Sequence, residues 1–64
     1  MQKIEKTKKL ENGVRVFWNE ENRLAQDFYS YEELIDMKIN AFDLLKNPGI
    51  YRVDRAVHRI ESSV

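Results

Sequence analysis

The segment from Ser30 to Lys46 constrains the fold most, because it carries both the start and the stop signals of a helix. Ser30 is a favourable N-cap, and Glu33 completes a capping box in which each side chain binds the other residue's backbone N–H group. The run Asn47-Pro48-Gly49 follows, and proline cannot continue a helix. We therefore expect a single helix that begins after Ser30 and ends at Leu45 or Lys46.

The expected helix has an acidic face and an unusually wide apolar face. At 100° per residue, one arc holds the acidic residues Glu32, Asp36 and Asp43. The remaining arc is mostly apolar and includes Ile35, Ile39 and Phe42. A helix that lies on a sheet needs an apolar stripe of only about 100°. The surplus is covered by a strongly curled sheet, by a second copy of the chain or by a foreign protein.

Two β-like runs flank the turn residues Glu11-Asn12-Gly13 and predict a hairpin. A two-residue Asn-Gly turn would pair Leu10 with Arg15, an apolar residue with a charged one. A three-residue loop with Gly13 as a left-handed bulge pairs Leu10 with Val14 instead. We prefer the bulged loop, because it gathers the apolar side chains on one face: Ile4, Leu10, Val14, Val16 and Trp18. On that face Trp18 is expected to anchor the core or a dimer.

A third strand over Arg23–Tyr29 and a last strand over Ile50–Ile60 complete the pattern. The order is therefore β-β-β-α-β. The expected fold is α+β, with a small antiparallel sheet, made of a three-stranded meander plus the C-terminal strand, packed on one helix. Residues 1–64 form one domain, with residues 61–64 as a flexible tail.

A chain of 64 residues without cysteine has few means of stabilising a small core. Domains of this size bury only about 60% of the surface of the unfolded chain, and disulfides are excluded here. Association of two copies is the remaining means, so we expect a homodimer. No apolar run reaches the roughly 18 residues of a membrane span, and the N-terminus lacks the apolar stretch of a signal peptide. These features predict a cytoplasmic protein that does not contact membranes.

Catalytic and cofactor chemistry finds little support in the residues. His58 is the single histidine, and it lies in the expected last strand, where we interpret it as structural. Gly13 and Gly49 are the two glycines, both in turns, so no glycine-rich phosphate loop exists. We therefore expect no enzymatic activity, no cofactor and no metal site.

Three surfaces are candidates for partner binding. The acidic helix face of Glu32, Asp36 and Asp43 could imitate a nucleic-acid backbone and occupy a site on another protein. The last strand combines aromatic and cationic side chains of the kind found at interface hot spots: Tyr51, Arg52, Arg55 and Arg59. The face opposite the apolar one carries the expected DNA-contacting residues Lys3, Lys9, Arg15 and Phe17, of which the lysines and the arginine would contact phosphates.

The segments Val14–Trp18 and Asp27–Leu34 resemble the strand and strand-to-helix pattern of the AP2-like arm-binding domains of phage-type integrases. The resemblance covers about a third of the chain and implies a sheet that lies in the major groove of DNA. The chain departs from the pattern at Glu20-Glu21, where a basic turn is expected, and in the long strand after the helix.

The preferred functional prediction is a small non-enzymatic accessory or regulatory protein that binds and modulates a larger protein. A phage or mobile-element inhibitor of a host factor is one form of that prediction. The alternative is a sheet-type DNA-binding module. The expected partners are a second copy of the chain and an unidentified protein, with nucleic acid as the less favoured choice.

Overall fold

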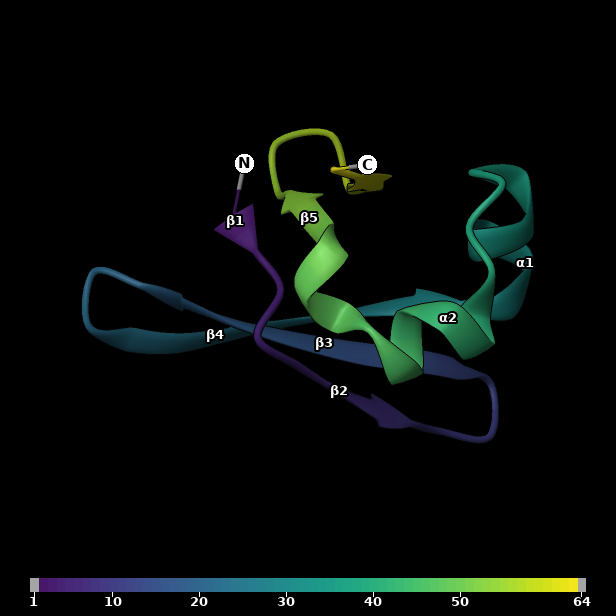
Figure 1. Ribbon diagram of the computed structural model, residues 1–64, viewed down its shortest axis with the longest axis horizontal. Coiled ribbons are helices and arrows are strands. Elements are labelled where there is room, and N and C mark those ends of the chain that lie inside the picture. The colour runs from purple at the N-terminus through teal and green to yellow at the C-terminus, as the bar shows by residue number, and fades with distance from the viewer. Residues whose placement is uncertain (1, 64) are drawn as a thin grey trace.

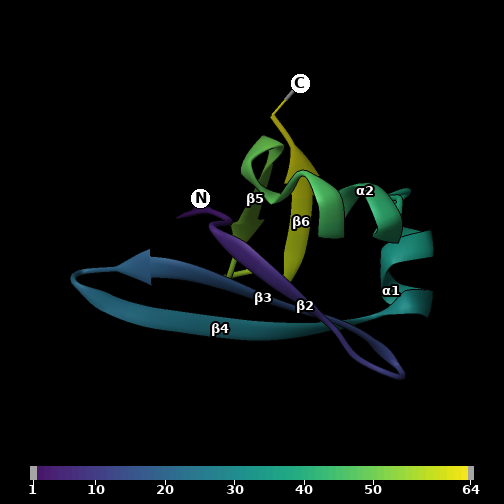
Figure 2. The ribbon, with the colours of Figure 1, turned by 60° about the horizontal axis from the view of Figure 1, so that its bottom comes forward.

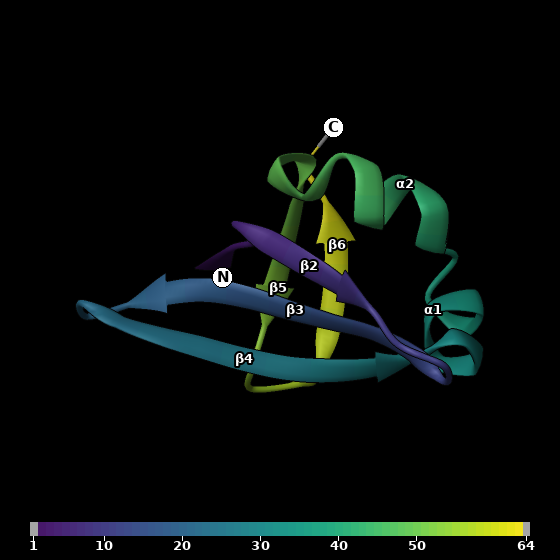
Figure 3. The same cartoon turned by 90° about the horizontal axis from the view of Figure 1, so that it is seen from below.

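Two three-stranded antiparallel sheets and two short helices build the fold in a computed structural model, which describes residues 2–63 (Figure 1). The first sheet, here the meander sheet, has the order β2–β3–β4, and the second, the closing sheet, has the order β1–β5–β6. The two sheets cross with the helices at one end of the molecule (Figures 2 and 3). The elements are β1 (Gln2–Lys3), β2 (Lys6–Lys9), β3 (Gly13–Glu20), β4 (Arg23–Ser30), α1 (Tyr31–Asp36), α2 (Ala41–Lys46), the 3-10 helix η1 (Pro48–Ile50), β5 (Tyr51–Asp54) and β6 (Arg59–Ser62). The predicted α+β class is confirmed, but the single sheet and the single helix are not.

The first hairpin forms with a register one residue away from the predicted one. Lys9, not Leu10, lies opposite Val14, and the Leu10 N–H donates to the Gly13 carbonyl at 2.8 Å. The predicted left-handed bulge is also wrong, because Gly13 does not adopt a positive φ. Glycine is required here by close packing, since a Cβ atom would lie 2.7 Å from the Cα atom of Ser30 on β4.

A break between β1 and β2 explains the register. The N–H group of Ile4 donates to the carbonyl of Tyr51 in the closing sheet at 3.1 Å. The next N–H group, of Glu5, donates to Phe17 in the meander sheet at 2.8 Å. Because the chain changes sheets at this point, Ile4 can be buried while Lys6, two residues later, is exposed.

The predicted single helix is wrong, because the chain forms two short helices joined by residues 37–40. The capping box at the start of α1 is confirmed: Ser30 Oγ accepts from the Glu33 N–H at 3.1 Å, and Glu33 Oε1 accepts from the Ser30 N–H at 2.9 Å. Lys38 takes a left-handed conformation with φ of 60°. Asn40 then caps α2 by accepting from the Asp43 N–H at 3.1 Å. The turn lets Leu34 of α1 and Leu44 of α2 both reach the core.

The predicted last strand is also wrong, because residues 50–60 form η1, β5, a turn and the start of β6. The pairing of Val53 with Ile60 places both side chains in the core. Glu61 and Ser62, expected in the flexible tail, belong to β6. Ser63 donates through its N–H and its hydroxyl to the Ile50 carbonyl at 2.7 and 2.9 Å. Residue 64 of the expected tail lies outside the described residues.

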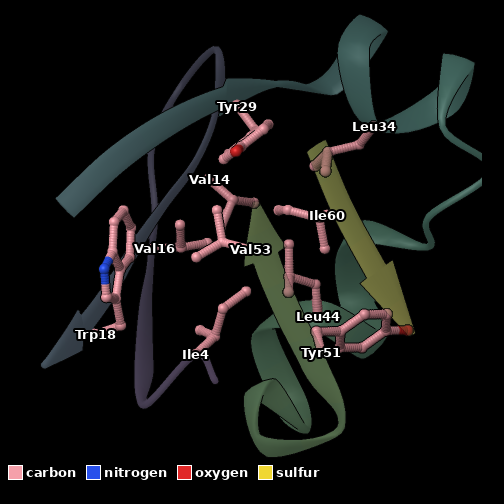
Figure 4. Packing of buried hydrophobic residues seen from close by; sticks show 10 residues of the cluster. All are labelled: Ile4, Val14, Val16, Trp18, Tyr29, Leu34, Leu44, Tyr51, Val53 and Ile60. Atoms are coloured by element: carbon pink, nitrogen blue, oxygen red, sulfur yellow. The ribbon is translucent and has the colours of Figure 1, made fainter. Parts of the chain in front are cut away.

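The core lies between the two sheets and is closed at one end by the helices (Figure 4). It consists of ten buried side chains: Ile4, Val14, Val16, Trp18, Tyr29, Leu34, Leu44, Tyr51, Val53 and Ile60. Among residues 2–63, no helix has the length and apolar character needed to cross a bilayer.

Candidate functional site

The outer face of the meander sheet carries cationic, aromatic and amide side chains. Within residues 2–63, no other element covers this face (Figure 3). Residues directly opposite in antiparallel strands share a face, so the register defines the rows of this open face. The rows across β2, β3 and β4 are Lys8–Arg15–Phe28 and Lys6–Phe17–Gln26, followed by Asn19–Leu24 on β3 and β4.

Two contacts hold the polar groups of the open face against the sheet. Arg15 Nη1 donates to Gln26 Oε1 at 3.0 Å. Lys6 Nζ lies 5.3 Å from the centroid of the Phe17 ring, within the range of a cation–π interaction. The guanidinium group and the ammonium group are therefore oriented along the face before any ligand arrives.

The cations of the open face are not balanced within the face. Lys8 lies directly opposite Arg15, and like charges in that position destabilise a sheet. None of the three rows contains a carboxylate. Glu5, just before β2, reaches the end of the face, where its Oε2 atom accepts from the N–H and Nδ2 groups of Asn19 at 3.2 and 2.7 Å. The cluster of Lys6, Lys8 and Arg15 is thus suited to an anionic ligand.

The outer face of the closing sheet provides a comparison within the same chain. There Arg52 lies between Lys3 and Glu61, and Asp54 lies opposite Arg59. The two pairs Arg52–Glu61 and Asp54–Arg59 have opposite charges, which stabilise a sheet, and Lys3 leaves one cation in excess. Both outer faces therefore carry an excess of cations, but the excess is larger on the open face, whose three rows hold three cations and no carboxylate.

The structure brings together only two of the four predicted DNA-contacting residues. Arg15 and Phe17 share the open face, but Lys3 lies opposite Arg52 in the closing sheet and Lys9 lies opposite Val14 on the inner side. The one-residue change of register is the reason for Lys9, and the break between β1 and β2 is the reason for Lys3. The change of register adds Lys6 and Lys8 to the open face, and the pairing of β3 with β4 adds Gln26 and Phe28; sequence reasoning missed all four.

The acidic helix face is divided between the two helices. Glu32 and Asp36 are exposed on α1, whereas Asp43 lies on α2. Asp43 accepts hydrogen bonds from the Tyr51 hydroxyl at 2.5 Å and from Asn47 Nδ2 at 3.0 Å. These bonds, the tyrosine bond first, lower the pKa of Asp43, while burial followed by the bond to Asp43 raises the pKa of Tyr51 to about 12. The Asp43 carboxylate therefore has a partner within the chain.

The predicted last-strand surface is dispersed in a similar way. Tyr51 is buried in the core, while Arg52 and Arg59 lie on the outer face of the closing sheet. Arg55 lies in the β5–β6 turn and donates to Glu20 Oε1 at 2.8 Å. The four residues do not form one patch.

The predicted anchors of a core or dimer separate into two groups. Trp18 belongs to the core at 1% exposure, and its Nε1 atom donates to Glu20 Oε2 at 3.1 Å. Ile39 is half-buried against the core. Ile35 and Phe42 remain 71% and 77% exposed.

His58 connects the β5–β6 turn to the meander sheet and to α1. Its ring stacks on Tyr29 with centroids 4.2 Å apart, Nδ1 lies 3.1 Å from Asp27 Oδ2, and Nε2 lies 3.0 Å from Glu33 Oε2. Burial, followed by the charge of Asp27, raises the pKa of Tyr29. Within residues 2–63, no group of three or more histidine and carboxylate side chains is arranged to hold a metal ion. Both ring nitrogens of His58 are engaged in contacts that fasten the fold.

The outer edge of β4 is protected at two backbone N–H groups. The N–H of Phe28 donates to Asp27 Oδ1 at 2.9 Å, and the N–H of Ser30 donates to Glu33 Oε1 at 2.9 Å. Side chains that bind edge groups in this way oppose the addition of a further strand. A partner therefore has better access to the open face than to this edge.

No family model, curated protein or solved structure matches the chain. The resemblance to integrase arm-binding domains thus stays an interpretation of the sequence.

Proposed function

We propose that this chain binds nucleic acid through the open face of the meander sheet. The observation that carries the proposal is the unbalanced pair of Lys8 and Arg15, which lie directly opposite each other with Lys6 in the next row. A phosphate backbone supplies the negative charges that this arrangement lacks, and lysine and arginine are the residues that most often contact it.

The uncharged side chains of the open face also suit nucleic acid. Phe17 and Phe28 are half-buried and offer ring surface to bases or sugars. Gln26 is exposed, and its amide can bind either a base edge or a phosphate. An acidic protein would use the cations but would have less use for this aromatic and amide surface.

The charge of the whole chain limits the strength of this binding. Lys and Arg together number 11, as do Asp and Glu, so the long-range field is small and attraction is local to the open face. With three cations at phosphates, the affinity for duplex DNA follows a log–log salt slope of about −2.7. The dissociation constant should therefore rise roughly 40-fold between 50 and 200 mM salt.

The test is fluorescence anisotropy with a short labelled duplex of mixed sequence and with one of its single strands. Lys8→Glu and Arg15→Glu should each weaken binding about tenfold or more, since each removes a charged contact. Arg52→Glu is the matched control, because it changes the net charge equally on the outer face of the closing sheet, away from Lys8 and Arg15. It should leave the affinity within about twofold, the effect of a distant screened charge.

Three results would refute the proposal. The unmodified chain could fail to bind either nucleic acid at low salt, or Arg52→Glu could weaken binding as much as Arg15→Glu. Poly-glutamate could also compete as well as unlabelled DNA, in which case the face would recognise charge alone.

The alternative proposal of an accessory protein that modulates a larger protein stays a prediction. Its acidic and last-strand surfaces are each dispersed, and Asp43 and Arg55 already bind side chains within the chain. The absence of catalysis and a phage-borne origin likewise stay predictions.

A further inference from the structure

An apolar groove lies at the helical end of the molecule, apart from the open face. Its volume is about 470 Å³, and its walls come from the β2–β3 loop, from the start of α1 and from α2. The residues that line it are Lys9, Leu10, Glu11, Tyr31, Ala41, Phe42 and Leu45.

Hydrogen bonds hold the groove in shape. The Tyr31 hydroxyl donates to the Leu10 carbonyl at 3.0 Å, and the Tyr31 N–H donates to the Asn12 carbonyl at 3.1 Å. On the other side, Thr7 Oγ1 donates to the carbonyl of Leu45 in α2 at 3.3 Å. The loop and both helices are thus tied together around a preformed cavity, which lowers the cost of binding.

A projecting apolar residue stands at the rim of the same groove. Phe42 is 77% exposed although it lines the cavity, and Ile35 on the preceding helix is 71% exposed. A groove and an exposed ring on one surface are what a two-fold interface requires, because each copy must present both the inserting group and its receptor.

The charged residues at the groove of one copy can pair with those at the groove of a second copy. Lys9 and Glu11 lie two residues apart at its edge, one cation and one carboxylate. A two-fold axis between them brings Lys9 of each copy toward Glu11 of the other. A strongly basic or acidic partner would meet one repulsive residue in either case, so the charges favour a second copy.

We propose that two copies of this chain associate through this groove, with Phe42 of each copy inserted into the groove of the other. The open face lies on the outer side of the meander sheet and stays free in the dimer. Association also supplies the stabilisation that a chain of this length without cysteine lacks. The inference does not depend on nucleic-acid binding and is tested without it.

The test is sedimentation equilibrium over a dilution series of the full chain. The unmodified chain should shift with concentration from 7.7 kDa towards twice that mass. Phe42→Asp should raise the dissociation constant of the dimer at least about 30-fold, as expected for a central interface residue. Val57→Asp is the matched control, because Val57 is 60% exposed in the β5–β6 turn, and it should leave the dissociation constant unchanged.

A charge exchange tests the two-fold arrangement itself. Lys9→Glu and Glu11→Lys should each weaken the dimer by roughly 2- to 5-fold, the scale of exposed ion pairs. The double variant Lys9→Glu/Glu11→Lys should recover the original dissociation constant. Circular dichroism of each variant checks that it remains folded.

A mass of 7.7 kDa at every concentration would overturn the dimer, and the groove would then be a site for a foreign protein. A dimer that forms equally well with Phe42→Asp would overturn the assignment to this groove. A double variant as weak as the single variants would overturn the two-fold pairing of Lys9 with Glu11.

Discussion

Replacing Gly13 with alanine tests the closest approach of two strands in the fold. A Cβ atom at this position would lie 2.7 Å from Ser30 Cα and 2.9 Å from Phe28 Cζ, and nearer still to the Tyr29 carbonyl oxygen. Two of these three atoms are backbone atoms of β4, so they cannot turn aside as the tip of a side chain can. The β3–β4 ladder must move at the Gly13–Ser30 pair to admit the methyl group.

The expected cost is at the upper end of the range for overpacking. Extra methyl groups in packed sites cost about 1–3 kcal/mol, and backbone obstruction favours about 3 kcal/mol here. A domain of this size has a free energy of unfolding of only roughly 3–10 kcal/mol. With a urea dependence of about 1 kcal/mol per molar, Gly13→Ala should lower the denaturation midpoint by roughly 2–3 M.

Urea denaturation followed by the fluorescence of buried Trp18 measures this change. Gly49→Ala is the control, because the nearest atom to its Cβ is Lys3 Cε at 3.7 Å, an ordinary contact. It should be neutral or stabilise by up to about 1 kcal/mol, since alanine restricts the unfolded chain.

Gly13→Asn distinguishes two reasons for a glycine at position 13, close packing against β4 and a left-handed backbone conformation. Asparagine tolerates left-handed backbone, so a bulge at Gly13 would accept asparagine more readily than alanine. Close packing predicts the reverse order, because asparagine is larger. A Gly13→Ala variant within about 0.5 kcal/mol of the unmodified chain would refute the packing argument, since surface substitutions without such a feature stay in that range.

Three further predictions follow from the hydrogen bonds of single side chains. Ser30→Ala removes the cap of α1 and should cost about 1 kcal/mol in urea denaturation. The backbone N–H of Ser30, ahead of the other contacts, lowers the pKa of Glu33, so its stabilising effect is present above the ordinary pKa of 4.5 and is lost as pH falls through the lowered pKa. The destabilisation by Glu33→Gln should therefore shrink in urea denaturations below pH 4.5, and a constant difference would contradict it. Tyr51→Phe should raise the pKa of Asp43 in an NMR titration, because the tyrosine hydroxyl is its strongest hydrogen-bond donor.

The start of the helical region could be predicted from the sequence, whereas its division into two helices could not be predicted from the stop signals alone. Capping depends on local contacts, and the box of Ser30 and Glu33 forms as expected. Asn40, three residues before Asp43, is a second N-cap signal of the same local kind. This signal conflicts with the apolar pattern, which continues through the segment and indicates a single helix. The observed division into two helices allows both Leu34 and Leu44 to be buried in the core.

The hairpin of β5 and β6 could have been inferred from the spacing of its apolar residues. The positions of Val53 and Ile60 differ by seven, an odd number, so one continuous strand would turn their side chains to opposite faces. Both are buried, which requires a turn between them. The local signal for that turn is Asp54, whose Oδ1 atom accepts from the Ala56 N–H at 3.1 Å, and no glycine, proline or asparagine follows it in the turn. His58 occupies the left-handed position with φ of 52°. The contacts of His58 with Asp27 and Glu33 are long-range and cannot be deduced from local sequence.

The candidate site depended on the register of β2 against β3, which is set by a long-range contact elsewhere in the chain. A continuous strand that buries Ile4 and Leu10 would also turn Lys6 and Lys8 inward, since all four positions have the same parity. That conflict was visible in the sequence and indicates a break. The place of the break was not visible, because it is fixed by the pairing of β1 with β5, far along the chain.

Lys8 and Lys9 are adjacent residues of the same type on opposite faces, so they test the register and the site together. Lys8→Glu should abolish the like-charge pair with Arg15 and raise the free energy of unfolding by roughly 0.2–1 kcal/mol. The same variant should weaken DNA binding and reduce the salt slope by about one. Lys9→Glu should leave the slope unchanged, because Lys9 lies opposite Val14 on the inner side.

A gain in stability coupled to a loss of binding is what a functional site predicts, because such sites retain residues that the fold alone would not favour. The predicted register, with Leu10 opposite Val14, would exchange the roles of the two lysines. If Lys8→Glu neither stabilises the chain nor weakens its binding, the unbalanced charge is ordinary solvated surface. In that case the main argument for nucleic-acid binding is lost, while the argument for the groove is unaffected.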